Sequence, residues 1–156
     1  AGLCLAIIAF LSGYSASGTG YLEAKTIIAN NGNHDPWYPL AKFLATIATY
    51  LTGIPGGIFA PSLATGAGVG ANLAEWFHIA PFSVMVLLGM ASYFSGVVQS
   101  PLTAFIIVIE MTMETNIMLP LLTATFIAYG FSRIVCPRPL YHTLAQAFIA
   151  KENSKK

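Results

Sequence analysis

Three long stretches of this chain contain no charged side chain, and this feature most limits what the chain can fold into. They run from Phe43 to Ala74, from Trp76 to Ile109 and from Thr115 to Ser132. Apolar stretches of this length without charge belong in a lipid bilayer. Charged residues make up only 8% of the chain, whereas a soluble domain carries roughly 25%. The sequence therefore predicts an integral membrane protein and argues against a water-soluble enzyme or binding module.

Net charge and the potential metal ligands exclude further classes of function. The formal net charge is +1, which argues against a nucleic-acid partner, because nucleic acids require a basic surface. The two cysteines, Cys4 and Cys136, are too few for a disulfide framework or a zinc cluster. The three histidines share no ligand spacing. We therefore expect no metal site and no cofactor.

Glycine and proline divide the apolar sequence into helices, most of them shorter than the about 20 residues that cross a bilayer. Helix ends at membrane depth are tolerated where they are buried in protein or line a cavity, and short broken helices are typical of transporter binding sites. Tilted or interfacial helices are the alternative. After an apolar start at Ala1–Leu11, the predicted helices are Tyr21–Ala29, Pro39–Leu51, Ile58–Phe77, Pro81–Tyr93, Pro101–Met113, Asn116–Ile134 and Leu140–Ala150.

The basic residues predict how the chain is oriented. Five of them, Arg133, Arg138, Lys151, Lys155 and Lys156, lie at or after the last long apolar segment. The positive-inside rule then places the C-terminus in the cytoplasm. We expect residues 1–150 to form one multi-pass membrane domain and residues 151–156 a short cytoplasmic tail. The first residues are apolar and lack an initiator Met, so we expect a fragment of a longer protein.

The segment Thr52–Ser62 carries the clearest signal for a binding site. It contains three glycines and two prolines and precedes an uncharged helix, with no Lys or Arg close by in the sequence. Glycines let a ligand approach the backbone, and a helix start presents about four N–H groups at the positive end of the helix dipole. Such an end suits a small anion that must be released again. A simple turn whose N–H groups bond to protein carbonyls fits the same residues, and both interpretations stay open.

Three motifs in order resemble one family of membrane proteins. Gly57-Ile58-Phe59-Ala60-Pro61 is similar to the GxFxP motif of the CLC family of chloride channels and chloride/proton antiporters. Residues 100–112 resemble the dimer-interface helix of that family, and Pro139-Leu140-Tyr141 resembles its last membrane helix, which carries a pore-lining tyrosine. The matches cover about Gly53 to Ala150, whereas Ala1–Tyr50 agrees with the family only in hydropathy and helix breaks.

The resemblance implies a fold, a function and a set of site residues. The fold would be an all-α, polytopic membrane protein with short, tilted and broken helices. The backbone N–H groups of Ile58 and Phe59 would bind the central chloride, with Gly57, Ala60 and Pro61 completing the motif, and the Tyr141 hydroxyl would donate to the same ion. The partners would be chloride, protons in an antiporter, the lipid bilayer and a second copy of the chain. The homodimer would be joined through Pro101–Met111 and Pro120–Ser132.

The other half of the family's anion site does not occur in this sequence. CLC proteins carry a GSGIP-type segment with a coordinating serine and a GxEGP-type segment with the gating glutamate, and neither motif is present. We therefore expect the chain to be the C-terminal inverted repeat of a CLC-type fold, which should not conduct alone. The sequence leaves open whether the transporter is a channel or an antiporter.

Other interpretations have less support. A secondary transporter for fluoride, nitrate or a small organic anion fits the broken helices, although a larger substrate would need more polar side chains. An intramembrane protease using Ser17 and His142 lacks an oxyanion signature, so the chain is not expected to be an enzyme. Glu110 is expected to be a helix-end carboxylate, hydrogen-bonded or paired with a base such as Arg133, rather than a proton relay. Gly66 and Gly70 are expected to serve helix packing.

Overall fold

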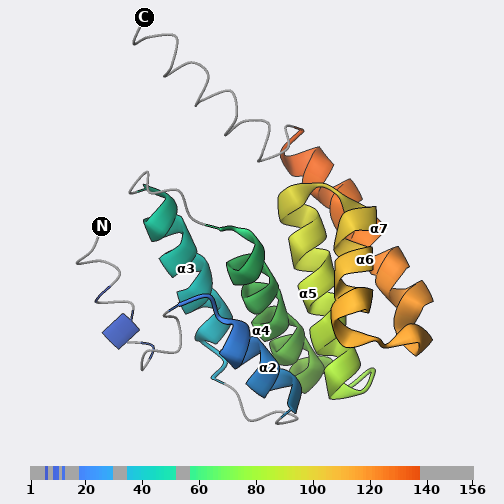
Figure 1. The fold of residues 1–156 in the computed structure, drawn as a ribbon, viewed down its shortest axis with the longest axis horizontal. Coiled ribbons are helices and arrows are strands. Elements are labelled where there is room, and N and C mark those ends of the chain that lie inside the picture. The colour runs from blue at the N-terminus through green and yellow to red at the C-terminus, as the bar shows by residue number, and fades with distance from the viewer. Residues whose placement is uncertain are drawn as a thin grey trace, which may run out of the picture.

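The computed structural model describes residues 18–29, 35–51 and 57–137, together with Ala6, Ala9, Phe10 and Ser12. The described residues form helices and contain no strand, as the sequence predicts (Figure 1). The helices with their bounds are α2 (Tyr21–Ala29), α3 (Tyr38–Leu51), α4 (Phe59–Phe77), α5 (Phe82–Val98), α6 (Pro101–Thr112) and α7 (Met118–Val135), with a short 3-10 helix at Thr115–Ile117. The predicted segments Ala1–Leu11 and Leu140–Ala150 lie outside the described residues, apart from Ala6, Ala9 and Phe10.

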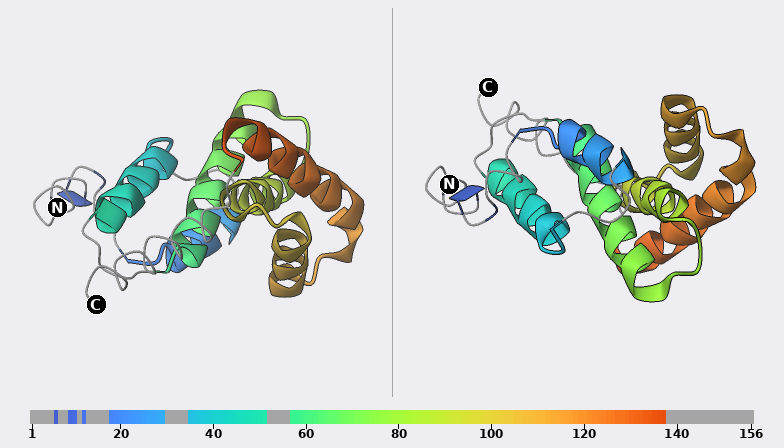
Figure 2. Two further views of the ribbon diagram at one scale, coloured as in Figure 1. Left: turned by 90° about the horizontal axis from the view of Figure 1, so that it is seen from above. Right: turned by 90° about the horizontal axis from the view of Figure 1, so that it is seen from below.

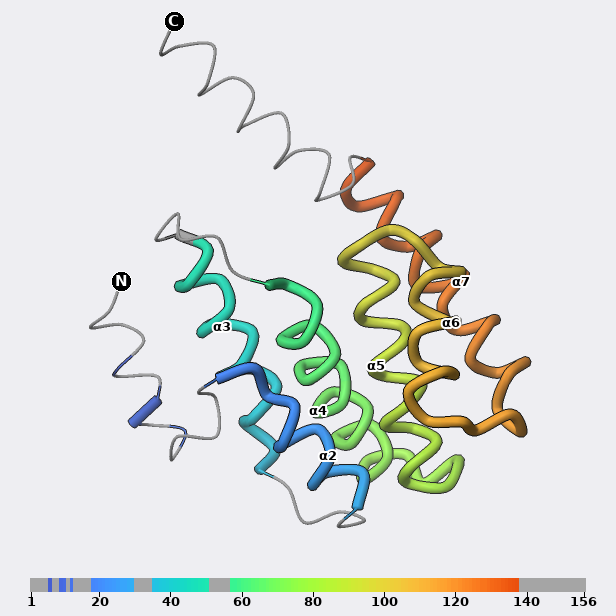
Figure 3. The backbone as a smooth tube through the Cα atoms, viewed as in Figure 1, coloured from blue at the N-terminus to red at the C-terminus, as the bar shows by residue number. Residues whose placement is uncertain are grey.

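The helices form a row in which α5 is central. Helices α3, α4 and α5 lie side by side, and α6 and α7 lie on the other side of α5 (Figures 1 and 2). The chain runs in alternating directions through α4, α5, α6 and α7 (Figure 3). The short helix α2 packs against α4 and also contacts α5. Helix α4 contacts α2, α3 and α5, and α5 contacts α2, α4, α6 and α7, so these two helices form the centre of the described bundle.

The predicted helix bounds agree with the structure in most places and are wrong at the end of α5. The bounds of α2 are those predicted, and those of α3, α4 and α6 differ by one residue at an end. Helix α5 continues past Tyr93 through Ser95 and Gly96 to Val98. The helix ends at Gln99, which has a left-handed backbone (φ 56°) and donates its N–H to the Ser95 carbonyl.

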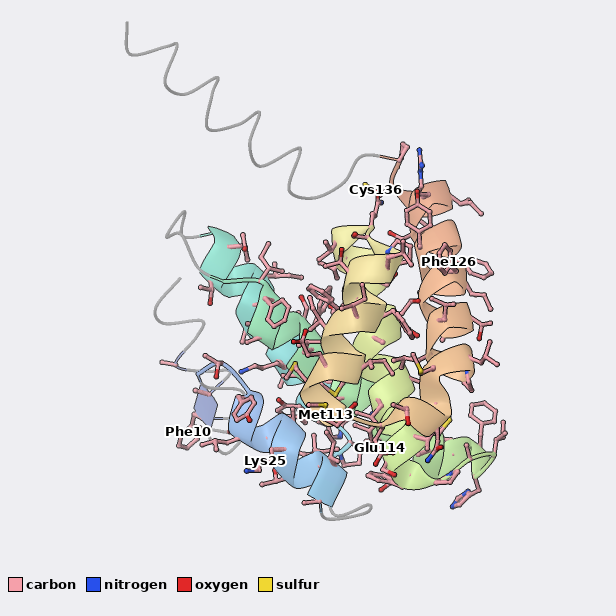
Figure 4. All side chains as sticks on the ribbon, turned by 45° about the vertical axis from the view of Figure 1, so that its right-hand side comes forward. Phe10, Lys25, Met113, Glu114, Phe126 and Cys136 are labelled. Carbon is pink, nitrogen blue, oxygen red and sulfur yellow. The ribbon has the colours of Figure 1, made fainter. Side chains whose placement is uncertain are left out.

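Among the described residues, one segment is long and apolar enough to cross a membrane. It is Thr115–Val135, with 21 residues, and α5 and α6 are apolar but shorter. Only 17% of its most apolar window is buried in the structure, so most of its side chains face outward, as Phe126 does (Figure 4). This exposure is typical of a helix that faces lipid or another protein chain.

The backbones of α4 and α5 touch at three glycines. A Cβ atom added to Gly66 would lie 2.6 Å from the Gly89 carbonyl oxygen and 2.8 Å from Met90 Cα, and one added to Gly70 would collide with the Met85 carbonyl oxygen. A Cβ atom on Gly89 would lie 2.6 Å from Gly70 Cα. Small residues at such positions let membrane helices approach closely. The packing role predicted for Gly66 and Gly70 is therefore confirmed, and Gly89 is their counterpart on α5.

Hydrogen bonds join α5 to α7 on the other side of α5. The Ser95 hydroxyl donates to the Thr125 carbonyl at 2.8 Å, and the Ser132 hydroxyl donates to the Gly96 carbonyl at 2.6 Å. The side-chain amide of Gln99 donates to the Cys136 carbonyl at 2.6 Å. Hydroxyl and amide side chains commonly connect helices in membranes, and here they hold α7 against α5 over its C-terminal half.

The glycine contact predicts a difference between two alanine substitutions. We expect Gly89→Ala to lower the free energy of unfolding by about 1–3 kcal/mol, because the new methyl group would force the backbones of α4 and α5 apart. Gly130→Ala on α7 is the matched control, since its Cβ would meet nothing within 4 Å, and alanine favours a helix interior by about 1 kcal/mol over glycine. Thermal unfolding in detergent would measure both, and equal melting temperatures for the two variants would contradict the packing role.

Candidate functional site

The glycine- and proline-rich motif forms the start of α4. Ile58 is the N-cap residue, and Phe59 is the first residue of the helix. Ile58 is buried, with 6% of its surface exposed, whereas Gly57 and Phe59 are exposed. A Cβ atom on Gly57 would meet nothing within 4 Å, so Gly57 borders open space. The motif therefore presents a helix N-terminus that a small ligand could approach.

Pro61 reduces the number of backbone N–H groups that are available there. The Ser62 N–H donates to the Ile58 carbonyl at 3.0 Å, which closes the first turn. Pro61 has no N–H to offer. The N–H groups of Phe59 and Ala60 have no acceptor within the helix, because a helix leaves its first donors unsatisfied. The roughly four backbone donors expected from the sequence are thus reduced to those of Ile58, Phe59 and Ala60. Ala60 therefore joins the two predicted residues as a candidate anion-binding residue.

A ring contact with α5 orients the first turn of α4. The rings of Phe59 and Phe94 meet edge to face, with centroids 4.9 Å apart and planes at 79°. Phe94 is buried, with 3% of its surface exposed. Edge-to-face pairs of this kind add about 0.5–1.5 kcal/mol beyond the burial of their area. Helix α5 therefore determines where the donors at the start of α4 lie.

A cavity of about 540 Å³ borders this first turn. Phe59, Ala60, Leu63 and Ala64 contribute to its wall from α4, and the remaining lining residues come from α2, α5, α6 and the turn after α6. Most of the wall is apolar, but Lys25 of α2 and Glu114 after α6 also line it, at the end of the molecule opposite Cys136 (Figure 4). The side chains in this wall that can donate a hydrogen bond are Tyr21, Lys25, Ser83 and Thr112, and the first-turn N–H groups of α4 add backbone donors to them.

The structure brings a charged side chain to α4 that sequence reasoning missed. Lys42 of α3 is 1% exposed, and its ammonium group donates to the Gly18 carbonyl at 2.9 Å. Next to it, the Tyr38 hydroxyl is buried and has no hydrogen-bond partner among the described residues. Along the chain, no Lys or Arg lies close to the start of α4, and the sequence analysis therefore did not place a positive charge beside this helix. A lone lysine within the apolar helix Tyr38–Leu51 was the available signal.

The sequence analysis also singled out Tyr141, Glu110 and Arg133. Tyr141 lies outside the described residues. Glu110 is exposed near the end of α6, as expected for a helix-end carboxylate. The suggested partner Arg133 instead donates to the Tyr129 hydroxyl at 2.8 Å, one turn earlier on α7. Glu110 and Arg133 do not pair because α6 and α7 run in opposite directions, which leaves the two residues at opposite ends of the helices (Figure 3).

Comparison with known proteins decides the family. The model of the voltage-gated chloride channel family matches residues 1–133. The chain belongs to this family. CLC proteins are integral membrane transporters, and the helical architecture of the described residues is consistent with that fold. The match also includes the first 50 residues, for which the sequence motifs gave no specific support.

The similar proteins include bacterial H(+)/Cl(−) exchange transporters named ClcA. The protein of Yersinia pestis is 31% identical over 165 aligned positions, which cover 99% of this chain and 34% of the relative. Those of Cronobacter sakazakii and Klebsiella pneumoniae are each 29% identical over 124 positions, covering 75% of this chain and 26% of the relative. The chain therefore spans about a quarter to a third of the length of these relatives.

Proposed function

We propose that this chain forms the C-terminal part of the membrane domain of a chloride transporter and contributes part of its anion site. The observation that carries the proposal is the start of α4, where the Phe59 and Ala60 N–H groups lack acceptors in the helix beside a cavity with a largely apolar wall. Partial positive charges on such groups can replace water around a chloride ion without the strong binding that a full charge would cause. No covalent chemistry is involved, so the protein acts as a transporter and not as an enzyme.

The N–H groups of Ile58 and Phe59, and the neighbouring one of Ala60, bind the ion in this proposal. The Tyr141 hydroxyl donates to the same ion, and the remaining ligands come from a part of the protein that this sequence does not include. The C-terminus lies in the cytoplasm, with Arg133 and the basic residues after it on that side. These assignments follow from the motifs and from charge distribution.

Chloride movement is coupled to protons in this proposal. The support comes from the relatives, which are named H(+)/Cl(−) exchange transporters. A decisive experiment uses the full-length protein that contains this chain, reconstituted in liposomes with a chloride gradient, with chloride efflux and external pH recorded together. We expect chloride flux to drive protons against their own gradient.

The other outcomes of this flux measurement correct the proposal in defined ways. Chloride flux without proton movement would make the protein a channel and overturn the coupling. If a folded preparation moves fluoride, nitrate or a small organic anion but no chloride, the anion assignment is wrong. If it moves none of these anions, the transport function itself is contradicted.

The backbone donors can be tested one at a time. We expect replacement of the Phe59 amide by an ester, through incorporation of the α-hydroxy analogue of phenylalanine, to weaken chloride binding by about 10-fold or more, because a hydrogen bond to a charged group contributes about 1.5–3 kcal/mol. The same ester at Val69 is the control, since that N–H bonds within the interior of α4 and lies away from the first turn. Isothermal titration calorimetry with chloride would measure both, and wild-type affinity in the ester variant would contradict the role of this donor.

We further propose that the protein is a homodimer joined through α6 and α7. Both helices present exposed apolar side chains, among them Ile106 at 54% and Ile127 at 60% exposure. Exposed apolar side chains on two neighbouring helices are suited to contact with a second copy of the same chain or with lipid.

Polar substitutions would show whether α6 and α7 contact a second copy of the chain or lipid. We expect the double variant Ile106→Gln/Ile127→Gln to shift the detergent-solubilised protein from dimer to monomer in light scattering, because two buried amides would lie unpaired at the interface. Val69→Gln, at an exposed position of α4 (37%), is the control and should leave the dimer intact. A double variant that remains dimeric would place the interface elsewhere.

A further inference from the structure

A groove of about 590 Å³ lies between α3 and α4 and shares no lining residue with the cavity at the start of α4. Most of its wall is apolar or aromatic, and no Asp, Glu, Lys or Arg is part of it. Its α4 side consists of Thr65, Val69, Asn72 and Trp76. These residues are three or four positions apart, so they form one continuous face of the helix. The groove therefore follows the axis of α4.

Two polar side chains in the groove already have hydrogen-bond partners. The Thr65 hydroxyl donates to the Pro61 carbonyl at 2.8 Å, within its own helix. The Asn72 side-chain amide donates to the Pro36 carbonyl at 2.9 Å and so connects α4 to the residues before α3. Because these donors are satisfied by the protein, an apolar ligand in the groove would not leave them unpaired.

The length of the groove matches the depth of one lipid leaflet. Trp76 follows Thr65 by eleven residues, which corresponds to about 16 Å along a helix. The hydrocarbon core of a bilayer is about 30 Å thick, so one leaflet contributes about 15 Å. A groove of this length can hold an acyl chain of one leaflet along the face of α4.

Two exposed tryptophans mark one end of the groove. Trp37 is 71% exposed and Trp76 is 73% exposed, and both line the groove. They lie at the same end because α3 begins where α4 ends, as the bond between Asn72 and Pro36 also requires (Figure 3). Tryptophan is enriched where the hydrocarbon of a membrane meets the headgroups. The groove thus extends from the headgroup level into the hydrocarbon.

The charges beside the two tryptophans are negative. Asp35 accepts the Trp37 N–H at 3.1 Å through its carboxylate, and Glu75 directly precedes Trp76. Lys25 belongs to the same end of the molecule but lines the other cavity. Carboxylates attract an ammonium group and repel an anionic headgroup. The charge at the mouth of the groove is therefore complementary to an ammonium-bearing lipid.

We propose that the groove between α3 and α4 binds a phospholipid whose headgroup carries an ammonium group. One acyl chain lies along Val69 and the other residues of the α4 face, and the headgroup lies at the level of Trp37 and Trp76. Asp35 and Glu75 favour this lipid over an anionic one. The site is separate from the proposed anion site at the start of α4, so the inference goes beyond chloride transport.

Binding of the acyl chain can be tested by filling the groove. Native mass spectrometry of the full-length protein in detergent would measure the affinity for dioleoylphosphatidylethanolamine. We expect Val69→Trp to weaken binding by about 5-fold or more, because the indole takes the space in which the chain is buried. Leu22→Trp is the matched control, since Leu22 is exposed on α2 and does not line the groove. If Val69→Trp does not fold, Leu40→Trp fills the groove from α3 instead.

The headgroup preference is tested with a second lipid that has the same acyl chains. We expect the wild type to bind dioleoylphosphatidylethanolamine more tightly than dioleoylphosphatidylglycerol. The double variant Asp35→Asn/Glu75→Gln should reduce this preference about 2- to 5-fold, as expected for the loss of exposed charge interactions. Glu110→Gln is the control, because it removes an exposed carboxylate on α6 that does not line the groove.

The opposite results would overturn the proposal in separate parts. Equal lipid affinity of the wild type and the variant that fills the groove would contradict the site, and this result is expected if another segment of the full-length protein covers the groove. Tighter binding of the glycerol lipid, or an unchanged preference in the double variant, would contradict the headgroup assignment. Neither result bears on chloride transport, which the flux measurement tests independently.

Discussion

At Gly66 and Gly70 the backbone of α4 lies against the backbone of α5 around Gly89, with no side chain between the two helices. This contact depends on the absence of three Cβ atoms, and the surrounding structure depends on the contact. It brings Phe94 of α5 under Phe59, so the first turn of α4 is oriented by a buried ring. Helix α5 then holds α7 through Ser95 and the residues near the end of α7.

The chain contains few charged side chains, and the proposed anion site does not depend on one in direct contact with the ion. The proposed anion site consists of backbone donors whose partial charges arise from the end of a helix. Among the described residues, the buried charged side chain is Lys42, and Gly20 leaves the space in which it approaches the second turn of α4. A site of weak donors can bind an anion and still release it, because no single contact holds the ion strongly.

Several elements were predictable from the residues because their signals are local. Proline at the start of α6 and glycine-rich sequence before α4 mark helix starts, and the bounds of α2, α3, α4 and α6 agree with the predictions to within one residue at each end. The spacing of Gly66 and Gly70 predicted close packing. The extension of α5 to Val98 was missed because Ser95 is satisfied by Thr125 of another helix, a partner that propensity along the chain does not reveal. The pairing suggested for Glu110 and Arg133 failed for the same reason, since helix direction is a tertiary property.

The sequence by itself determined the class of the protein, the location of its glycine- and proline-rich motif and its family, because long uncharged stretches and the motif around Gly57–Pro61 are properties of consecutive residues. Only the tertiary structure decided which helix lies against the start of α4, that Phe94 contacts the ring of Phe59, and that Lys42 lies close to the second turn. These features depend on contacts between residues far apart in the chain. Such contacts form where Gly20, Gly66, Gly70 and Gly89 let the backbone or a neighbouring side chain approach, and the strength of an electrostatic interaction depends on that distance in space.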